Sequence, residues 1–317
     1  MSQLIDGHSA GVFVIAPTPF HPDGRLDLDS ARRMCDWYVE HGATGMTILG
    51  IMGEAPKLAA DEAIAFTRCV LQHLDGRLPV IVGVSHPGLD QLAALAAQSM
   101  DLGAAGVMVA PMPTLKTDDA IHAYYAQVVQ RLGSVPVCLQ DYPQTLGVHF
   151  SASLLARIFR DQPTIVMLKH EDCPGLAKLS AFRALCASVV GRRVSILVGN
   201  GGLHYPQELA RGADGAMTGF AFPEMLRQVW DLFNAGQADA GETLFDAYLP
   251  LVRHELQPGL GLAIRKHVLA RRGAIAHPTL RAPGPRLTAD DIAEIDHLWR
   301  RLERRLAALA ERAPTLS

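Results

Sequence analysis

A lone lysine at the end of an apolar run is the residue of this sequence best suited to covalent chemistry. The chain has 29 basic residues, but only five are lysines, and one of these, Lys169, follows the apolar run Ile165–Leu168. An arginine keeps its proton, whereas a lysine amine can lose it and attack a carbonyl carbon, and apolar surroundings favour the uncharged amine. Position alone leaves two interpretations open: a nucleophile that forms an imine, or a lysine that pairs with a carboxylate.

Two glycine-bearing loops are candidates for binding an anion. Gly50–Glu54 and Gly199–Gly202 each follow an apolar run, and glycine lets backbone N–H groups approach a carboxylate or a phosphate. Because many barrel enzymes bind phosphate in the loops after their last two strands, a sugar-phosphate enzyme is an alternative interpretation. Glu54 is either a catalytic carboxylate or, as is commoner before a helix, a cap or a partner of the helix dipole.

Short apolar runs alternate along the chain with segments of helical periodicity, which predicts eight β/α units. Each run is nearly continuous in Val, Ile, Leu and Met, as in parallel strands that are buried on both faces. Eight units within about 220 residues favour a closed (β/α)8 TIM barrel over a doubly wound open sheet, and no GxGxxG loop follows the first run. The predicted strands are 12–16, 45–49, 80–84, 106–110, 135–139, 165–168, 194–198 and 215–219.

Beyond about residue 237 the strand pattern ends and three helical segments follow, at 241–256, 260–272 and 288–312. We therefore predict a barrel catalytic domain over 1–236, and a C-terminal three-helix region over 237–317 that packs on the barrel. The last helix carries arginines between its apolar residues, which indicates a solvated or subunit-facing surface in preference to a nucleic-acid site.

Composition narrows the class of protein. Hydrophobic residues make up 49% of the chain and charged residues 19%, with a net charge of -3, so a large core is expected and a nucleic-acid or anionic membrane surface is not. The N-terminal sequence lacks a signal-peptide pattern, and no apolar run reaches the roughly 18 residues of a membrane-spanning helix. The five cysteines are scattered without CxxC spacing, which predicts reduced thiols in a cytoplasmic protein and no metal site.

Four motifs in order resemble the dihydrodipicolinate synthase / N-acetylneuraminate lyase family of class I Schiff-base aldolases. They are Ala16–Phe20, the GxxGE loop Gly50–Glu54, the strand lysine Ile165–Lys169, and Gly215–Gly219. The resemblance covers most of the chain, and it implies a TIM barrel in which Lys169 forms an imine with pyruvate or a larger 2-keto acid. It also implies an aldolase or hydro-lyase that needs no cofactor and assembles as a homo-oligomer, a tetramer or a dimer.

The chain departs from that family at the residues that move protons. Ile51 and Met52 stand where the family loop has hydroxyl side chains, and Gln140 stands where its proton-shuttling tyrosine follows the fifth strand. A second tyrosine of the synthases is replaced within Pro111–Pro113, and their substrate-binding arginine has no basic counterpart near Gln144. An amide cannot act as a general acid or base near neutral pH. These changes argue against the lysine-biosynthesis reaction and against the sialic-acid lyase pattern.

The resulting site prediction names Lys169 and Gln140 as catalytic. The predicted substrate contacts are Ile51, Met52, Gly199 and Met217. Three side chains, or an ordered water, are candidates to replace the missing tyrosine: Asp141, Tyr142 and His170. The alternative hypothesis is a family member that binds a keto acid but has lost turnover. The sequence does not identify the keto acid; 2-keto-3-deoxy sugar acids and aromatic keto acids are the first to test, because Ile51 and Met52 make the pocket apolar.

Overall fold

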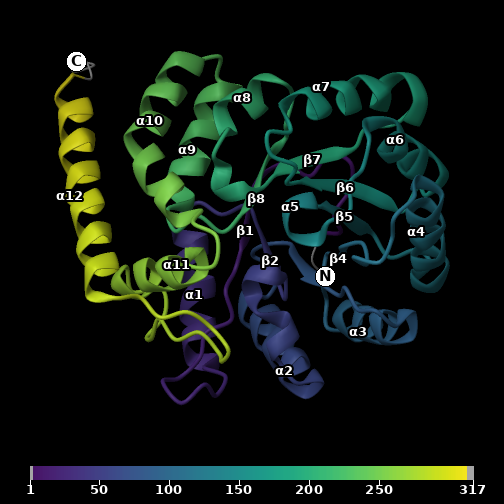
Figure 1. Ribbon diagram of the computed structural model, residues 1–317, viewed down its shortest axis with the longest axis horizontal. Helices are drawn as coiled ribbons and strands as arrows, with labels where there is room; N and C mark the ends of the chain where they lie inside the picture. Colours follow the sequence, from purple (N-terminus) through teal and green to yellow (C-terminus); the bar gives the residue numbers. More distant parts are fainter. Residues whose placement is uncertain (1–2, 313–317) are drawn as a thin grey trace.

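Eight parallel strands close into a barrel in the computed structural model, which describes residues 3–312 (Figure 1). The strands pair in chain order, and β8 completes the barrel by pairing with β1. This confirms the predicted (β/α)8 TIM barrel. The strands are β1 (Gly11–Ile15), β2 (Gly45–Ile48), β3 (Val80–Gly83), β4 (Gly106–Val109), β5 (Val137–Asp141), β6 (Ile165–His170), β7 (Ser195–Val198) and β8 (Gly215–Thr218).

Helices surround the barrel, and the three C-terminal helices lie close to their predicted bounds. Most follow a strand directly and bury one apolar face against it, as in other barrels of this type. They are α1 (Leu28–Glu40), α2 (Ala60–Leu74), α3 (Leu89–Asp101), α4 (Asp118–Leu132), α5 (Pro143–Leu146), α6 (Ala152–Asp161), α7 (Leu176–Leu185), α8 (Tyr205–Ala210), α9 (Pro223–Asn234), α10 (Ala238–Glu255), α11 (Gly261–Arg271) and α12 (Ala289–Arg312). None of the helices in the described part of the chain is both long and apolar enough to cross a membrane.

The barrel interior is filled by side chains that alternate along the strands. Met167 of β6, Cys138 of β5, Leu197 of β7 and Met217 of β8 belong to one buried cluster inside the barrel, separate from the larger core between strands and helices. Successive strand residues point to opposite faces, so the next inward position after Met167 is Lys169. The apolar layer therefore lies directly beneath Lys169 inside the barrel.

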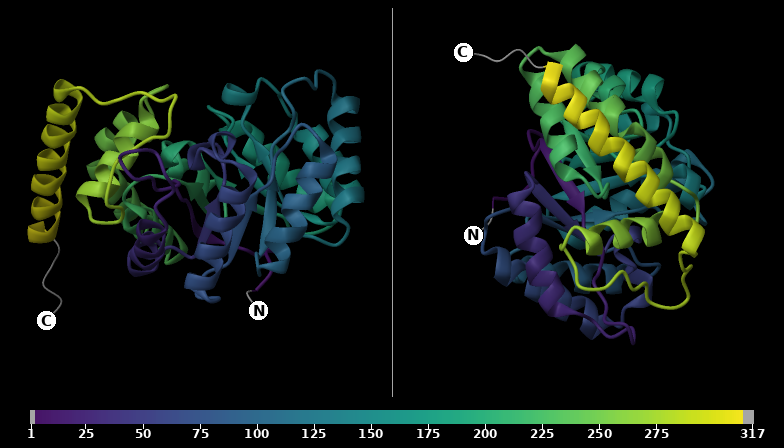
Figure 2. Two further views of the ribbon diagram at one scale, coloured as in Figure 1. Left: turned by 90° about the horizontal axis from the view of Figure 1, so that it is seen from below. Right: turned by 90° about the vertical axis from the view of Figure 1, so that its left-hand side faces the viewer.

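The three C-terminal helices lie together on one side of the barrel (Figure 2). Helix α10 packs on α9, and both α11 and α12 pack on α10. A buried ion pair joins α10 to α11, because Arg265 Nε lies 2.7 Å from Glu255 Oε1, while Glu255 Oε2 accepts from the backbone N–H of Ala221. These helices thus contact the chain just after β8, at the end of the barrel where the strand-end loops lie.

Strands β5 and β6 run further than the sequence predicted. Gln140 pairs with Lys169 and Asp141 with His170, so all four residues belong to the sheet instead of the loops that follow it. The apolar pattern stopped at Leu139 and Leu168 because the added residues are polar, yet all four are buried. Their side chains find polar partners inside the protein, which offsets the cost of removing them from water.

A prediction concerns the tight packing of β8 on β1. A Cβ atom on Gly215 would lie 1.9 Å from the backbone oxygen of Gly11, with φ at +151°. We expect Gly215→Ala to lower the free energy of unfolding by about 3 kcal/mol or more, because backbone atoms of a closed barrel cannot move aside. Chemical denaturation followed by circular dichroism measures this change.

Gly76→Ala is the matched control for Gly215→Ala. Gly76 also has a positive φ, of +78°, but its added Cβ would meet no atom within 4 Å. Its expected cost is the conformational one alone, about 1 kcal/mol. Equal losses in the two variants would contradict the steric argument.

Candidate active site

Lys169 lies inside the C-terminal end of the barrel and is almost fully buried. It is the fifth residue of β6, and only 4% of its surface is exposed. Its Nζ lies 3.0 Å from Oε2 of Glu171. The sequence left open whether this lysine is a nucleophile or pairs with a carboxylate. The structure contains the pairing, and a carboxylate beside an amine is compatible with nucleophilic chemistry because it can accept the proton that the amine loses.

Glu171 is the site residue that the sequence did not predict. Its carboxylate is held between two strands, because Gln140 Nε2 of β5 donates to the same Oε2 atom at 2.7 Å. A signal is present in the sequence: residues 167, 169 and 171 alternate, so an extended β6 directs Met167, Lys169 and Glu171 to one face. Gln140 and Lys169, both predicted catalytic residues, are thus joined through a carboxylate.

The loop after β7 is shaped around Glu171. A Cβ atom on Gly199 would lie 2.3 Å from Cγ and 2.6 Å from Oε1 of Glu171, so only glycine leaves room for this carboxylate. Asn200, which follows with φ at +51°, donates from Nδ2 to the backbone oxygen of Glu171. Gly199 was predicted as a substrate contact. That contact stays a prediction, and the geometry shows that Gly199 leaves room for the carboxylate beside Lys169.

The other predicted substrate contacts lie at different depths. Ile51 is 39% exposed at the barrel mouth, and Met52 is half-buried against the interior cluster. Met217 is fully buried within that cluster, two residues from the end of the predicted strand 215–219. Cys138 lies in the same layer as Met217, and burial raises the pKa of its thiol to about 12, so it stays protonated near Lys169.

The loop after β2 begins and ends in left-handed backbone. Leu49 has φ at +53° and Glu54 at +56°, and between them Ile51–Gly53 form one turn of 3-10 helix. The first N–H groups of such a turn have no partner within it and are available to an anion. Glu54 does not cap α2, which begins at Ala60 after Ala59. Its carboxylate is instead buried among basic groups.

Two of the three candidates for the missing tyrosine point away from the barrel interior. Asp141 and His170 lie on the outer face of the sheet, where Asp141 Oδ2 is 2.6 Å from Nζ of Lys178 in α7, and His170 Nε2 is 3.1 Å from the oxygen of Gly175. Nearby, burial raises the pKa of Glu208 to about 7, and His170 opposes this shift. Tyr142 is half-buried and precedes α5. The contacts of Asp141 and His170 therefore fix the ends of β5 and β6 on the outer face of the barrel.

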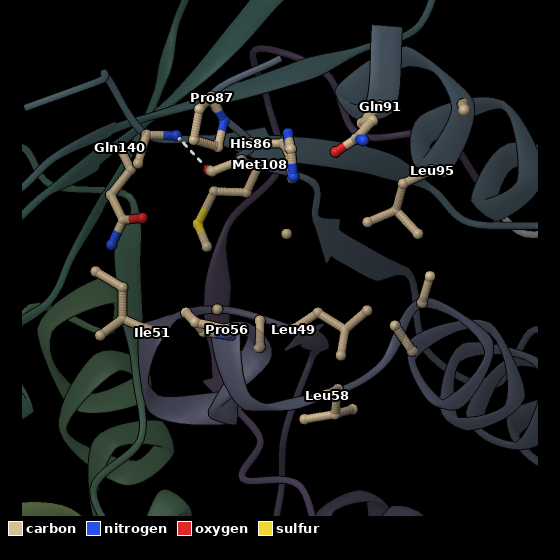
Figure 3. A pocket seen from close by; sticks show the side chains of 18 of the residues that line it. Leu49, Ile51, Pro56, Leu58, His86, Pro87, Gln91, Leu95, Met108 and Gln140 are labelled. Atoms are coloured by element: carbon tan, nitrogen blue, oxygen red, sulfur yellow. Dashed lines mark hydrogen bonds between the residues drawn. The ribbon is translucent and has the colours of Figure 1, made fainter. Parts of the chain in front are cut away.

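A cavity of about 1270 Å³ opens beside Gln140 at the barrel mouth (Figure 3). Gln140 and Ile51 lie at one side of it, Met108 lies between, and Gln91 and Leu95 lie at the opposite side. Lys169 and Glu171 do not line the cavity, but Gln140 touches both the cavity and the Glu171 carboxylate. Mostly apolar side chains surround the space, and a few polar residues able to orient a ligand lie at both sides, Gln140 at one and Gln91 at the other.

Comparisons with known proteins show which family the chain belongs to. The chain matches the model of the dihydrodipicolinate synthetase family over residues 8–300. It is 34% identical over 298 residues to an L-2-keto-3-deoxyarabonate dehydratase from Azospirillum brasilense, across 92% of this chain and 94% of that protein. It is 29% identical over 281 residues to a 4-hydroxy-tetrahydrodipicolinate synthase from Xanthomonas campestris pv. campestris, across 86% and 88% of the two chains.

A solved structure extends the likeness to three dimensions. The crystal structure of a dihydrodipicolinate synthase from Rhodopseudomonas palustris has a TM-score of 0.92 and 48% sequence identity, and the match covers 95% of this chain and 100% of that one. The barrel and the C-terminal helices therefore belong to one shared framework. The chain is a member of the dihydrodipicolinate synthetase family and one of its class I lyases.

Proposed function

We propose that this lyase is a hydro-lyase that removes water from a 2-keto-3-deoxy sugar acid through an imine at Lys169. The observation that carries the proposal is the Glu171 carboxylate, 3.0 Å from the Lys169 amine and held by Gln140. It supplies a buried acid–base group where a tyrosine is absent. The relative from Azospirillum brasilense, named as a dehydratase of such an acid, supports the same reaction class.

In the first step Lys169 attacks the keto carbon of the substrate. Glu171 accepts a proton as the amine becomes a nucleophile, and it returns a proton to the carbinolamine hydroxyl, which leaves as water. The product of this step is a protonated imine that draws electrons from the neighbouring carbon. The interior cluster beneath Lys169, which includes Met167 and Leu197, keeps the reacting nitrogen in apolar surroundings.

In the second step Glu171 removes a proton from C3, next to the imine carbon, and an enamine forms. The enamine electrons then expel the hydroxyl group at C4, which takes up a proton and leaves as water. Hydrolysis of the remaining imine releases the product and restores the Lys169 amine. One carboxylate serves both the C3 proton and the leaving hydroxyl because Gln140 and the Gly199 loop hold it in one place.

The substrate carboxylate is assigned to the backbone of the loop after β2. Ile51 and Met52 offer N–H groups but no hydroxyl, so this loop binds charge without relaying protons. Binding at Gly50–Gly53 is thereby separate from proton transfer at Glu171. This separation disfavours the synthase reaction, for which the family resemblance implies a proton relay through hydroxyl side chains. Assembly as a homo-oligomer and a cytoplasmic location stay predictions.

The test of function is the product that the protein makes. With 2-keto-3-deoxy pentonates and hexonates we expect products lighter by one water in mass spectrometry, and no pyruvate in an assay coupled to lactate dehydrogenase. Stoichiometric pyruvate would indicate aldol cleavage instead of dehydration. Condensation of pyruvate with aspartate semialdehyde would indicate the synthase reaction, and either result would overturn the hydro-lyase proposal.

A second prediction concerns the imine. Incubation with pyruvate followed by borohydride should add one reduced keto-acid unit to the protein, and peptide mapping should place it on Lys169. Lys169→Arg should abolish the adduct, because a guanidinium stays protonated and does not attack the carbonyl. The adduct at Lys178 or Lys266 in place of Lys169 would contradict the assignment of the nucleophile.

A third prediction concerns Glu171. Glu171→Gln keeps the shape of the side chain but cannot take a proton, so we expect kcat for dehydration to fall by about 10²–10⁴-fold. Gly199→Ala should lower kcat as well, because its added Cβ would displace the carboxylate. Asp161→Asn is the matched control, since Asp161 is exposed at the end of α6 and pairs with Arg160 and His122 outside the site. Unchanged kcat in Glu171→Gln would remove the carboxylate from the mechanism.

A further inference from the structure

Glu54 is a buried carboxylate that the mechanism does not use. Its side chain is 1% exposed, and its backbone is left-handed, which is uncommon outside glycine, asparagine and aspartate. Its carboxylate lies 2.6 Å from Nζ of Lys266 and 2.9 Å from Nζ of Lys57, and it accepts from the backbone N–H of Arg281 at 3.0 Å. Three positions thus converge on the residue that ends the loop Gly50–Gly53.

Lys266 comes from α11, outside the barrel, and is completely buried. Its amine donates to the backbone oxygen of Thr18 at 2.7 Å, to Oε1 of Glu54 and to the backbone oxygen of Thr279. Thr18 in turn donates from Oγ1 to the backbone oxygen of Gly53 at 2.5 Å. One amine therefore fastens the C-terminal end of the loop at two adjacent residues: directly at Glu54, and through Thr18 at Gly53.

Arg281 completes the attachment. Its guanidinium pairs with Glu62 of α2 and donates to the backbone oxygens of Gly24 and Lys57. The segment from Lys266 to Arg281 therefore bonds to the parts of the chain that follow β1 and β2, which are neighbouring strands. Neither Glu54 nor Lys266 lines the cavity, so any influence on a ligand must pass through the loop.

We propose that Lys266 and Glu54 are positioning residues that hold the loop Gly50–Gly53 in the shape that binds the substrate carboxylate. The inference rests on the proposed function, which assigns the carboxylate to this loop. A buried ion pair is weak support for overall stability, because desolvation offsets much of the attraction. Its place at a left-handed residue directly after the loop indicates a local role, because the pair holds a strained backbone that would otherwise relax.

The titration of Lys266 provides a readout that a purely structural role lacks. Burial lowers the pKa of Lys266 to about 8, Glu54 opposes this shift, and Lys57 and Arg281 add to it; the Phe20 ring packs against the amine. Above this pH the amine has two N–H donors for three acceptors, and the loop loses one attachment.

The sign of the stability effect separates this readout from unfolding. The pKa of Lys266 is lower in the folded protein than its usual value of 10.5, so the folded chain releases this proton first. Between about pH 8 and 10.5 the titration of Lys266 therefore increases the free energy of unfolding as the pH rises, so it does not promote unfolding. Weaker binding of carboxylates between about pH 8 and 10.5 would therefore come from a change in the loop and not from unfolding.

The experiment compares Lys169 trapping in the wild type, Lys266→Met and Glu54→Gln. Pyruvate carries the carboxylate and propanal does not, and the borohydride adduct on Lys169 is quantified by peptide mapping for each. We expect half-maximal trapping to need at least tenfold more pyruvate in Lys266→Met and at least threefold more in Glu54→Gln. Trapping with propanal should change less than twofold.

Arg183→Met is the matched control. It removes a partly buried ion pair to Asp214, the residue before β8, at the opposite end of that strand from the site. Its dependence on pyruvate should equal that of the wild type. In the wild type the pyruvate concentration for half-maximal trapping should rise from pH 7 to pH 9, and in Lys266→Met this rise should be absent.

The outcomes separate the two proposals. A wild type that forms no adduct with any keto acid overturns the proposed function. A wild-type adduct together with unchanged pyruvate dependence in both variants overturns the positioning role, as does an equal loss of trapping with pyruvate and propanal. Should Lys266→Met not fold, Glu54→Gln decides, because it keeps the size of the side chain. Should neither fold, a flat pH series in the wild type overturns the proposal.

Discussion

A buried amine and a buried carboxylate 3.0 Å apart set the requirements for the rest of the site. Each charge loses its hydration inside the barrel, and a buried pair offsets that loss only when further hydrogen bonds complete it. Removing one partner of such a pair typically costs about 3–5 kcal/mol, because the other charge is left uncompensated. Lys169 and Glu171 therefore depend on groups that fix the carboxylate: the Gln140 amide on one side and the Gly199 loop on the other.

The barrel positions these groups because side chains along each strand point alternately inward and outward. Because inward and outward residues alternate, β5 and β6 present Gln140 and Lys169 to the interior, while Asp141 and His170 face the helices. The outward pair bonds to α7 and its neighbouring loop, which keeps the polar strand ends in register. Structure on the outer face thereby limits the movement of the reacting groups on the inner face. Catalytic groups must be held within fractions of an ångström, and rigid strands do this better than loops.

The fold could be predicted from the sequence because its signals are local and repeated. The eight apolar runs lie within two residues of the observed strands, apart from the polar ends of β5 and β6. The lysine could be found because its type and position are unusual. Glu171 could not be found by the same rule, since a carboxylate after an apolar run looks like a loop residue until the strand is known to continue. The attachment of Glu54 to Lys266 joins residues 212 positions apart, and no local pattern encodes such a contact.

The residues that replace the family's hydroxyl groups around Lys169 are consistent with one another if proton transfer has moved to another group. The family resemblance implies a relay that passes protons through the loop hydroxyls and a tyrosine, and this chain lacks both. In the proposed mechanism Glu171 places a carboxylate beside the amine, so that Ile51, Met52 and Gln140 do not need to carry protons. The loop keeps the part of its role that the backbone can perform, and its shape becomes more important because no side chain helps it bind. In the proposed positioning role, the buried ion pair of Glu54 and Lys266 fixes the backbone at the end of this loop, and α11 then contributes to binding without entering the site.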